Sequence, residues 1–553
     1  MSTYDKASLV LIPSGTKTNK IYSQKPINGD GDFSFSRSTM ATRVNESGLI
    51  EKETQNLLLQ SNNFNTTWGE NFGTNPRISG QTGYDGTNDA WLLEKDAYTY
   101  AYMFQDLSAS GLQTYSVYAK ANTLSQATIY INGNANNYYG KFNLSNGSVV
   151  ATANIITSNV VDVGSGWYRL SITINDTTSR VRIYPDFAET SAGSIYIQDA
   201  QLEQGLVARD YIETTTSAVY GGITDNVPRI DYTDASCPSL LLEPTRTNRI
   251  SNSEFINNDS SWAEENGADC TPNYAISPEG VKNATRVQLD NSGANLLTRI
   301  WHNFTPDSSN DTASFYAKSN TGSSFDITFY LRDSGFGTVR ATKTVTLTNE
   351  WQRFELTADC SGASGNVMLL LYNTTASENW DFLLYAPQVE AGSYATSYIP
   401  CYGTSVTRNT ERPNYLDVTN LTGSSFTIFL DYKDAIRDGN TGNWMYLYNT
   451  SNQLLTYVYG TTLMLHSTSG EDYTSFTFGD GKVAFVYDGT NVKYFLNGTL
   501  VKTVTASTRW DLGAEKYWLY NPFNNSTSTI KYNSFIILPE AITDQEAINL
   551  TTL

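Results

Sequence analysis

Short runs in which hydrophobic and polar residues alternate recur along most of the chain. The run TIYIN at 128–132 and the run VRIY at 181–184 are two examples, and clusters of Gly, Asn, Asp and Ser separate such runs. Alternation with a period of two puts one set of side chains on each face of a sheet, so these runs predict antiparallel strands buried on one face. Because the runs recur about every 8–12 residues, they favour β-sandwiches or jelly rolls over α/β folds.

Helical periodicity is nearly absent from the chain. The best candidate is a short turn near Asp544, where Thr543 can cap the helix and Glu546 stands at its third position. The predicted fold class is therefore all-β.

Two stretches of the chain repeat nearly the same phrase, IYIQDAQLEQGLVARDYIETT at 195–215 and FLLYAPQVEAGSYATSYIPCY at 382–402. Other landmarks recur in the same order, namely NLL (56–58) with NRI (248–250), YSVYAKANT (115–123) with ASFYAKSNT (313–321), and GWYRLSITI (166–174) with EWQRFELTA (350–358). The spacing between the copies is too long for a solenoid repeat, so it predicts a duplicated domain.

From about Tyr415 the pattern changes to strands joined by tight turns. The strands VAFVY (483–487) and VKYFL (492–496) flank Asp-Gly-Thr-Asn, and Asn497-Gly498 then turns the chain back. These turns predict hairpins of a third sandwich. The expected organisation is an arm (1–55), jelly roll 1 (56–213), a connector (214–247), jelly roll 2 (248–401), a linker (402–414) and a sandwich resembling lectins (415–553). The apolar run 240–242 in the connector must be buried somewhere.

The charge of the chain argues against nucleic acid as a partner. The formal net charge is −19 and the pI about 4.6, and no stripe of Lys and Arg offsets that sign locally. No apolar run is long enough to span a membrane, and the apolar patch near the N-terminus is too brief for a secretory signal. Aromatic residues make up 13% of the chain, which favours a folded β protein over a disordered one.

Residue inventory gives little support for catalysis or a metal site. His302 and His466 are the only histidines and fall in different predicted domains, and no G-x-S-x-G motif is present. The four cysteines lack zinc spacing and are expected to be free, and NGDGDF at 28–33 fails as a calcium loop. We expect a protein that is not an enzyme and has no cofactor. Scattered loop carboxylates remain compatible with a structural calcium ion, and two carboxylates would suffice for glycoside hydrolysis.

Some repeated residues are expected to be structural. Glu203 and Glu390 hold the same place in the two copies, and we expect each to accept hydrogen bonds from backbone or from an arginine. Trp167 and Trp351 are likewise repeated, and we expect them in the cores.

Sugar binding requires aromatic rings against the C–H face of a pyranose and planar polar groups for its hydroxyls. In the first jelly roll, alternation places Ile129, Ile131, Val181 and Ile183 in the core. The opposite face then carries the candidate glycan-binding residues Tyr130, Asn132, Arg182, Tyr184 and Asp186. Secondary candidates are Tyr330 and Tyr372 in the second jelly roll and Trp444 and Tyr446 in the third domain. The alternative is that these faces are solvated or pack against other subunits.

Several segments resemble structural proteins of tailed bacteriophages. The segments SLVLIPSGTKTNKIYSQKP (8–26), FSFSRSTMATRVNESGLIE (33–51) and VPRIDYTDASCPSLLLEPTRTN (227–248) resemble stretches that recur in those proteins. The landmarks YAKANT, GWYRLSI and QLEQGLVARDYI resemble the jelly rolls, similar to carbohydrate-binding modules, of phage head fibres, tail fibres and related adhesins. The segment VAFVYDGTNVKYFLNGTLV resembles a concanavalin A or laminin G sandwich.

The resemblance implies a protein of the virion surface, made in the host bacterial cytoplasm. It implies a homo-oligomer, often a homotrimer, whose N-terminal arm contacts other virion proteins and whose modules attach to bacterial surface or environmental polysaccharide. It does not separate a head fibre from a tail fibre. The alternatives are a purely structural capsid or tail decoration and a tail spike that degrades polysaccharide.

Overall fold

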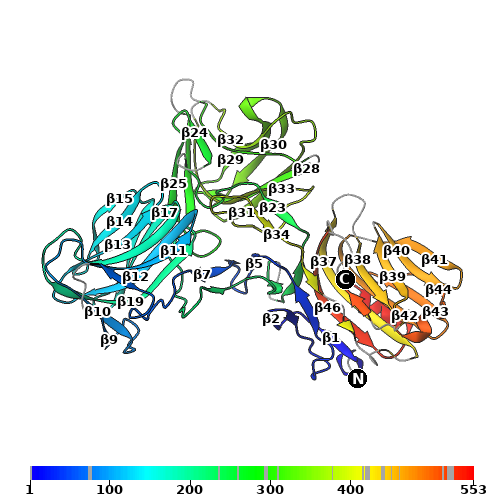
Figure 1. Cartoon of the computed structure of the whole chain (residues 1–553). Coiled ribbons are helices and arrows are strands. Elements are labelled where there is room, and N and C mark those ends of the chain that lie inside the picture. Colours follow the sequence, from blue (N-terminus) through cyan, green and yellow to red (C-terminus); the bar gives the residue numbers. More distant parts are fainter. Residues whose placement is uncertain are drawn as a thin grey trace.

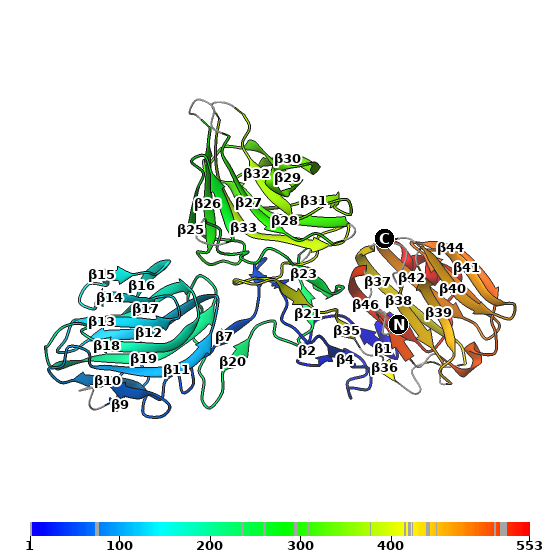
Figure 2. The same cartoon turned by 45° about the horizontal axis from the view of Figure 1, so that its top comes forward.

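The protein consists of three β-sandwiches arranged around a centre of connecting segments (Figures 1 and 2). The computed structural model describes residues 3–71, 77–233, 237–257, 261–291, 297–307, 310–375, 378–413, 416–417, 422, 424–437, 443–449, 451–459, 461–476, 478–513, 516–519 and 528–553. Two short α-helices, α1 (Thr3–Lys6) and α2 (Asp544–Thr551), lie near the chain ends. Thr543 and Glu546 form the predicted capping box at α2. The all-β prediction is confirmed.

The first sandwich, module 1 (56–213), has two sheets of six strands. One sheet runs in the order β16 (Thr157–Gly164), β17 (Trp167–Asn175), β12 (Leu112–Ala121), β19 (Gly193–Gln204), β10 (Ala90–Lys95) and β9 (Arg77–Gln81). The other runs β15 (Ser148–Ala153), β14 (Asn137–Asn143), β13 (Gln126–Gly133), β18 (Thr178–Pro185), β11 (Tyr102–Ala109) and β8 (Gly69–Asn71). The core between the sheets contains Ile129, Ile131, Val181 and Ile183, as alternation predicted.

The second sandwich, module 2 (248–401), repeats this strand order without counterparts of the edge strands β15 and β16. One sheet runs β31 (Gln352–Asp359), β28 (Asn310–Ser319), β33 (Asn379–Ala391), β26 (Ala284–Asp290) and β25 (Asp269–Ala275). The other runs β30 (Val339–Leu347), β29 (Phe325–Asp333), β32 (Val367–Tyr372), β27 (Arg299–Phe304) and β24 (Trp262–Glu265), with a 3₁₀ turn at Ser334–Phe336 between β29 and β30. The matching strand order shows that one fold occurs twice.

Two buried asparagines anchor equivalent points of the modules. The amide of Asn56 donates to Ile212 O at 2.8 Å and accepts from Leu202 N at 3.2 Å. The amide of Asn248 donates to Ile399 O at 2.8 Å and accepts from Val389 N at 3.2 Å. A buried amide is tolerated when its groups are bonded. Each asparagine therefore ties the start of its module to the module's last strand and closing loop.

The third sandwich contains strands from distant parts of the chain. Its larger sheet runs β21 (Arg229–Asp231), β22 (Ser239–Leu242), β46 (Ser528–Leu538), β37 (Phe426–Arg437), β42 (Gly479–Tyr487), β43 (Asn491–Leu496) and β44 (Thr499–Thr505), and β1 (Leu9–Leu11) also pairs with β46. Its second sheet runs β36 (Leu416–Asp417), β45 (Lys516–Trp518), β38 (Asn443–Tyr448), β39 (Leu454–Tyr459), β40 (Thr462–Ser467) and β41 (Gly470–Ser475). A 3₁₀ turn, Trp510–Leu512, lies between β44 and β45.

The third sandwich includes residues of the N-terminal arm, which the sequence pattern predicts to be separate. Leu9 and Leu11 are fully buried in the core of the third sandwich, together with Leu240 and Leu242 of the connector. The side chains of Leu9 and Leu11 are removed from water by pairing of β1 with β46, more than 500 residues away in sequence. The run 240–242 is buried, as predicted, and the arm and the connector both belong in part to this sandwich.

The remaining connecting segments form short ladders at the centre of the molecule. The ladders are β2 (Thr16–Lys17) with β3 (Lys20–Ile21), β4 (Phe33–Ser36) and β35 (Arg412–Pro413), β5 (Arg43–Val44) with β6 (Ile50–Glu51), β7 (Thr54–Asn56) with β20 (Val219–Gly221), and β23 (Arg246–Asn248) with β34 (Val406–Arg408). They pair segments of the arm (1–55), the connector (214–247) and the linker (402–414) with one another.

Five buried charged side chains from three connecting segments meet at this centre, and we call them the hub. They are Arg37, Arg229, Glu243, Arg408 and Glu411. Arg229 Nη1 and Arg408 Nη1 each lie 2.7 Å from Glu243 Oε2. Although burial opposes ionisation, Arg408 and Arg229 hold the pKa of Glu243 well below its usual value. The paired charges fix the connecting segments to one another.

A second buried charge cluster joins modules 1 and 2. Arg209, which follows β19, lies with Nη2 2.5 Å from Glu279 Oε1 of module 2. Lys52 Nζ lies 3.4 Å from Glu279 Oε2 and also pairs with Glu254. The modules are therefore joined by ion pairs as well as by the chain.

Candidate functional site

The outer face of the module 1 sheet containing β13 and β18 carries aromatic rings around one arginine. Tyr130 on β13 is the direct cross-strand neighbour of Arg182 on β18. Tyr139 on β14 lies opposite Tyr130, with the two rings stacked at 5.9 Å, and Phe104 on β11 lies opposite Arg182. Together with Tyr102 and Tyr184, these residues form what we call the Arg182 face, comprising Tyr102, Phe104, Tyr130, Tyr139, Arg182 and Tyr184.

Aromatic rings hold the guanidinium of Arg182 in place. Its central carbon lies 4.5 Å from the ring centroid of Tyr102 and 4.9 Å from that of Tyr130, within cation–π range. Nη1 donates to Tyr184 Oη at 2.9 Å, and Nε is buried without a hydrogen-bond partner. The side chain as a whole is partly exposed. Arg182 thus presents a positioned cation with donors to spare.

Tyr184 does not have the exposure that alternation predicted. It shares the outer face but is only 1% exposed, and burial raises its pKa to about 12. The ring of Phe187, in the loop after β18, packs edge-on against it at 4.9 Å and also lies 5.3 Å from Tyr139. Sequence alternation fixes the face on which a side chain lies, but not whether a neighbouring loop covers it. Tyr184 therefore supports the face and is not available for contact.

Asp186 was expected on the same face, but it lies beyond the strand. β18 ends at Pro185, and Asp186 and Ala188 have φ values of 60° and 67°, in the left-handed region that favours glycine. Two lysines fix this turn, because Lys95 Nζ donates to Asp186 O at 3.0 Å and Lys141 Nζ donates to Phe187 O at 3.0 Å. Asp186 is buried, so it helps to place Phe187 rather than facing a ligand.

The end of the face near Asn132 is polar. Asn132 is partly exposed and its amide donates to Asn137 Oδ1 at 3.0 Å. Across the sheet from it, Arg180 pairs with Asp106 and lies 3.8 Å over the ring of Phe104. The aromatic rings, the Asn132 amide and the Arg180–Asp106 ion pair thus lie next to one another on one surface of the sheet.

Two exposed tyrosines at the edge of this face are absent from the predicted site. Tyr98 and Tyr100 precede β11 and are 55% and 57% exposed, and the ring of Tyr100 lies 5.9 Å from Phe187. The signal was present in the sequence, since Tyr98, Tyr100 and Tyr102 alternate in the run YTYAY. Phe187 carried no comparable signal, because its position depends on the fold of a loop.

Module 2 has a corresponding face with a different arginine. Tyr330 and Tyr372 lie on it, partly exposed, with ring centroids 6.3 Å apart. Arg299 on β27 lies 3.6 Å over Phe336 and 5.4 Å from Tyr372. Leu370, which faces Tyr330 across the sheet, is fully buried.

The candidates in the third sandwich give no comparable surface. Tyr446 is only 8% exposed, and its ring stacks against Tyr448 and Tyr457 at 6.2 and 6.0 Å. Tyr446 was predicted as a contact residue, but its packing within the sheet leaves little of it accessible. The side chain of Trp444 lies outside the described residues.

The repeated glutamates have the hydrogen bonds expected of structural groups. Glu203 Oε1 accepts from Gln201 Nε2 at 2.7 Å and from Arg209 N at 3.0 Å. Glu390 Oε1 accepts from Gln388 Nε2 at 2.8 Å, and from a backbone N–H in the same place of the repeat. The prediction that they accept backbone hydrogen bonds is confirmed. In both modules, the repeated stretch therefore supplies a glutamate that holds the loop after the last strand by hydrogen bonds.

The repeated tryptophans differ in burial. Trp167 is buried, as predicted, and packs with Ala90 and Tyr118. Trp351 is only partly buried and donates through Nε1 to Ile276 O at 3.3 Å. The prediction of a core position is therefore wrong for Trp351, because the second module leaves this ring at its edge.

One histidine lies beside serines. His302 Nε2 is 2.8 Å from Ser261 Oγ and 3.2 Å from Ser251 Oγ, and burial lowers the pKa of His302 to about 4. Among the residues described, no carboxylate is hydrogen-bonded to its buried Nδ1, as a general base of a catalytic triad requires. Within the described ranges, no group of three His, Cys, Asp or Glu residues is arranged to hold a metal ion. Cys270, Cys360 and Cys401 are buried free thiols, and Cys237 is exposed.

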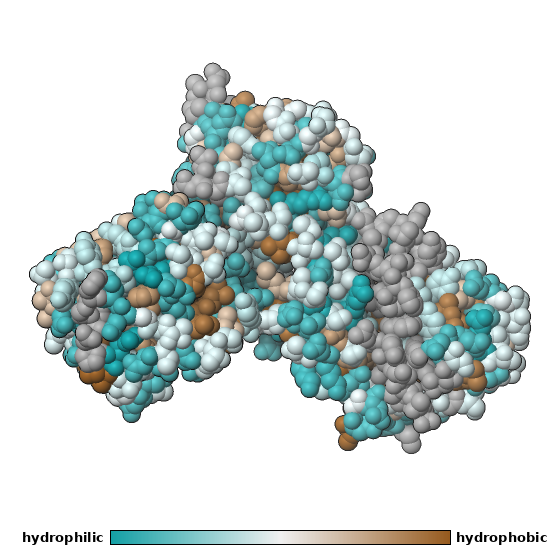
Figure 3. Space-filling model, viewed as in Figure 1, coloured by the Kyte–Doolittle hydropathy of each residue, from teal (hydrophilic) through white to brown (hydrophobic). Residues whose placement is uncertain are grey.

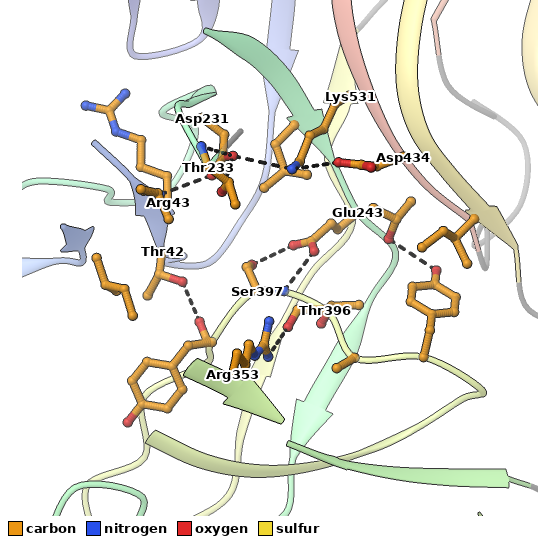
Figure 4. A pocket seen from close by; sticks show the side chains of 18 of the residues that line it. Thr42, Arg43, Asp231, Thr233, Glu243, Arg353, Thr396, Ser397, Asp434 and Lys531 are labelled. Atoms are coloured by element: carbon orange, nitrogen blue, oxygen red, sulfur yellow. Dashed lines mark hydrogen bonds and ion pairs between the residues drawn. The ribbon is translucent and has the colours of Figure 1, made fainter. Parts of the chain in front are cut away.

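A cavity of about 340 Å³ lies where module 2, the connecting segments and the third sandwich meet (Figure 4). Lys531 Nζ lies 2.9 Å from Asp434 Oδ2 and 3.7 Å from Asp231 Oδ1. Glu243 accepts from the backbone N–H and the hydroxyl of Ser397 at 2.8 and 2.6 Å. Because these charged groups pair with one another, we interpret the cavity as part of the junction between module 2, the connecting segments and the third sandwich.

The surface is mainly hydrophilic in the view of Figure 3, where hydrophobic residues form small separate groups. Among the helices in the described part of the chain, none has the length and apolar character needed to cross a bilayer.

No protein-family model matches the chain, and no curated protein matches it in sequence. Among solved structures, the enzymatically active domain of tailspike protein 4 of bacteriophage CBA120 aligns with 26% of this chain and 21% of its own, at 12% identity and a TM-score of 0.20. This chain thus spans about a fifth of the length of that structure.

Two further structures contain CBM51 modules. The tandem CBM51 modules of a family 98 glycoside hydrolase from Streptococcus pneumoniae SP3-BS71 align over 64% of this chain and 96% of theirs, at 12% identity and a TM-score of 0.17. The M60 catalytic domain with two CBM51 domains of Clostridium perfringens ZmpB aligns over 70% and 44%, at 9% identity and a TM-score of 0.18. Likenesses this weak assign neither a family nor an activity to this chain.

Proposed function

We propose that this protein is a bacteriophage virion surface fibre that attaches weakly and multivalently to glycans of the host surface or the environment. The Arg182 face carries the proposal of glycan binding. The partly exposed rings of Phe104, Tyr130 and Tyr139 offer apolar surface to a pyranose. Arg182 and Asn132 offer planar donors to the hydroxyls. The virion location is supported by the resemblance of segments 8–26, 33–51 and 227–248 to phage structural proteins.

The shallowness of the face explains why attachment would be multivalent. A sheet surface encloses little of a sugar, so one module binds weakly. Two modules in each chain, and several chains in a homo-oligomer such as a trimer, raise the effective concentration of sites. The ion pair between Arg209 and Glu279 helps to hold the two modules in a fixed relation, which favours simultaneous engagement of two sites.

A test uses the whole chain on an array of bacterial surface polysaccharides. Tyr130→Ala removes a partly exposed ring from the face, and Tyr220→Ala removes a 53% exposed ring from a connecting segment as the matched control. We expect wild type and Tyr220→Ala to be retained on at least one polysaccharide, with retention at least tenfold weaker for Tyr130→Ala. Absence of retention on every polysaccharide would contradict glycan binding, and release of reducing ends would indicate a degrading enzyme instead.

The burial of Tyr184 and the buried hub favour a second candidate, a purely structural capsid or tail decoration whose modules act as rigid spacers. Retention that is equal for wild type and Tyr130→Ala would support it. Immunogold labelling of intact virions with an antibody to the third sandwich tests the virion location separately. Label on the head or on the tail would also separate the two kinds of fibre, and unlabelled particles would contradict both.

A further inference from the structure

We infer that the Arg182 face of module 1 recognises acidic glycans through the carboxylate of a uronic acid. This inference rests on the proposed function, because it names the class of glycan for the same face. It starts from the charge of Arg182, which no carboxylate in the described part of the chain balances by an ion pair.

The other charged side chains around the face are paired. Arg180 forms a bidentate pair with Asp106, with Nε 2.5 Å from Oδ1 and Nη2 2.9 Å from Oδ2. Lys141 Nζ lies 3.7 Å from Asp186 Oδ1 and 3.8 Å from Glu189 Oε1. Lys95, behind the same loop, donates to the carbonyl of Asp186. The carboxylates of Asp186 and Glu189 favour its charged form. Arg182 forms no ion pair of its own in the described part of the chain, and the Asp106 carboxylate that its charge also influences is already held by Arg180.

The contacts of Arg182 leave its hydrogen-bonding capacity largely unused. A guanidinium has five N–H donors, and the hydrogen bond to Tyr184 Oη uses one of them. Nε is buried and unpartnered, which is costly for a donor in a site of reduced dielectric. A carboxylate can accept two parallel bonds from such a fork, and this pairing is among the strongest hydrogen-bonded interactions in proteins. The rings of Tyr102 and Tyr130 fix the fork before the ligand arrives.

Module 2 provides an internal contrast at the corresponding face. Arg299 also lies among aromatic rings, but it is paired with Glu265. Arg332 on the same face donates to Gly337 O at 2.9 Å and to Phe336 O at 2.6 Å, so its Nε and one Nη are already occupied. In module 2, Arg299 is thus neutralised by a carboxylate and Arg332 already spends two of its five N–H donors on backbone carbonyls, so an acidic sugar is expected to prefer module 1.

The experiment measures binding of the whole chain to immobilised hyaluronan, alginate and polygalacturonate, and to the same three polymers after chemical reduction of their carboxyl groups. The variants are Arg182→Gln and Arg182→Lys, with Arg299→Gln and the exposed Arg412→Gln as controls. We expect at least one acidic polymer to bind at least tenfold more tightly than its reduced form. Arg182→Gln should abolish that difference, Arg182→Lys should keep part of it, and the controls should keep all of it.

The outcomes separate this inference from the proposed function. Equal binding of an acidic polymer and its reduced form, with sensitivity to Tyr130→Ala, would overturn the acidic specificity and leave glycan binding intact. Unchanged binding of acidic polymers by Arg182→Gln would also overturn it. Failure to bind any acidic or neutral polysaccharide would overturn both. The melting temperature of each variant shows whether a loss reflects unfolding.

Discussion

Arg229 Nη2 lies 2.7 Å from Glu411 Oε1 in the hub, and neither side chain is exposed to solvent. The two residues are separated by the whole of module 2, and Arg37 from the start of the chain lies 3.3 Å from the same oxygen. Burial lowers the pKa of Arg37 to about 10, and Glu411 counteracts that effect. One carboxylate thus stabilises two buried cations from different connecting segments.

We therefore expect Glu411→Gln to destabilise the centre of the molecule. Removing one partner of a buried ion pair leaves uncompensated charge, which costs about 3–5 kcal/mol. Differential scanning calorimetry of the whole chain should show a lower first transition. Lys493→Ala, which breaks the more exposed pair with Asp544, should leave that transition close to wild type. An equal temperature of the first transition in both variants would contradict a stabilising role of the hub.

The strand β1 should stabilise a sandwich that lies far from it in sequence. Leu11 is fully buried against β46, whereas the next residue, Ile12, is 38% exposed. Leu11→Ala should cost the third sandwich about 2–5 kcal/mol, because it removes buried methyl groups and leaves a cavity. Ile12→Ala should cost much less. Amide hydrogen exchange of β46 measures the difference, and equal protection in the two variants would argue against the pairing.

Module 1 should lose stability as the pH rises from about 4 to about 7. Burial, with nearby Asp89 and Asp85, raises the pKa of Asp199 from 3.8 to about 7, although Tyr84 donates a hydrogen bond to it. The unfolded chain ionises this carboxyl near its ordinary pKa, whereas the folded module keeps it protonated up to about pH 7. Its contribution to the free energy of unfolding is therefore greatest below about pH 4 and declines by roughly 3–4 kcal/mol up to pH 7.

Asp199→Asn tests this dependence, because the amide oxygen can still accept from Tyr84. Urea unfolding at pH 4.5 and pH 8 should show a gain in stability for the variant at pH 8 and a much smaller change at pH 4.5. A constant difference between wild type and variant across this range would show that Asp199 does not titrate in it.

Module 2 should respond to pH in the opposite sense. Burial lowers the pKa of His302 from 6.5 to about 4, so the folded module keeps the ring neutral while the unfolded chain protonates it. The stability from His302 is fully present above pH 6.5 and is lost as the pH falls towards 4. Because the chain has only two histidines, NMR of the imidazole protons can follow both, and His466→Gln assigns them. A midpoint for His302 near 6.5 would contradict its burial.

Local pattern was sufficient for much of the fold. Alternation at 128–132 and 181–184 placed Ile129 and Val181 in the core, because the period of a strand fixes the face of each side chain. The repeated phrase around Glu203 and Glu390 revealed the duplication, and the hydrogen bonds of both glutamates explain why it was retained. Turn residues located the hairpins of the third sandwich.

The candidate site was predictable only in part. The sequence placed Tyr130 and Arg182 on the same face, since alternation fixes the face of each side chain. Only the structure showed that they are direct cross-strand neighbours. It did not indicate that Phe187 would cover Tyr184, because the loop that carries Phe187 is positioned by lysines from β10 and β14. Access to a face depends on such long-range packing.

The sequence by itself determined that the chain forms β-sandwiches, that one of them occurs twice, and which side of each strand is apolar. These properties depend on neighbours a few residues apart and on repetition. Only the tertiary structure decided that β1 completes a sheet with the last strand, that five buried charges meet in the hub, and that Arg182 forms no ion pair with the residues described. The physical reason is that burial and charge balance are sums over segments brought together by folding, and the order of residues along the chain does not specify those sums.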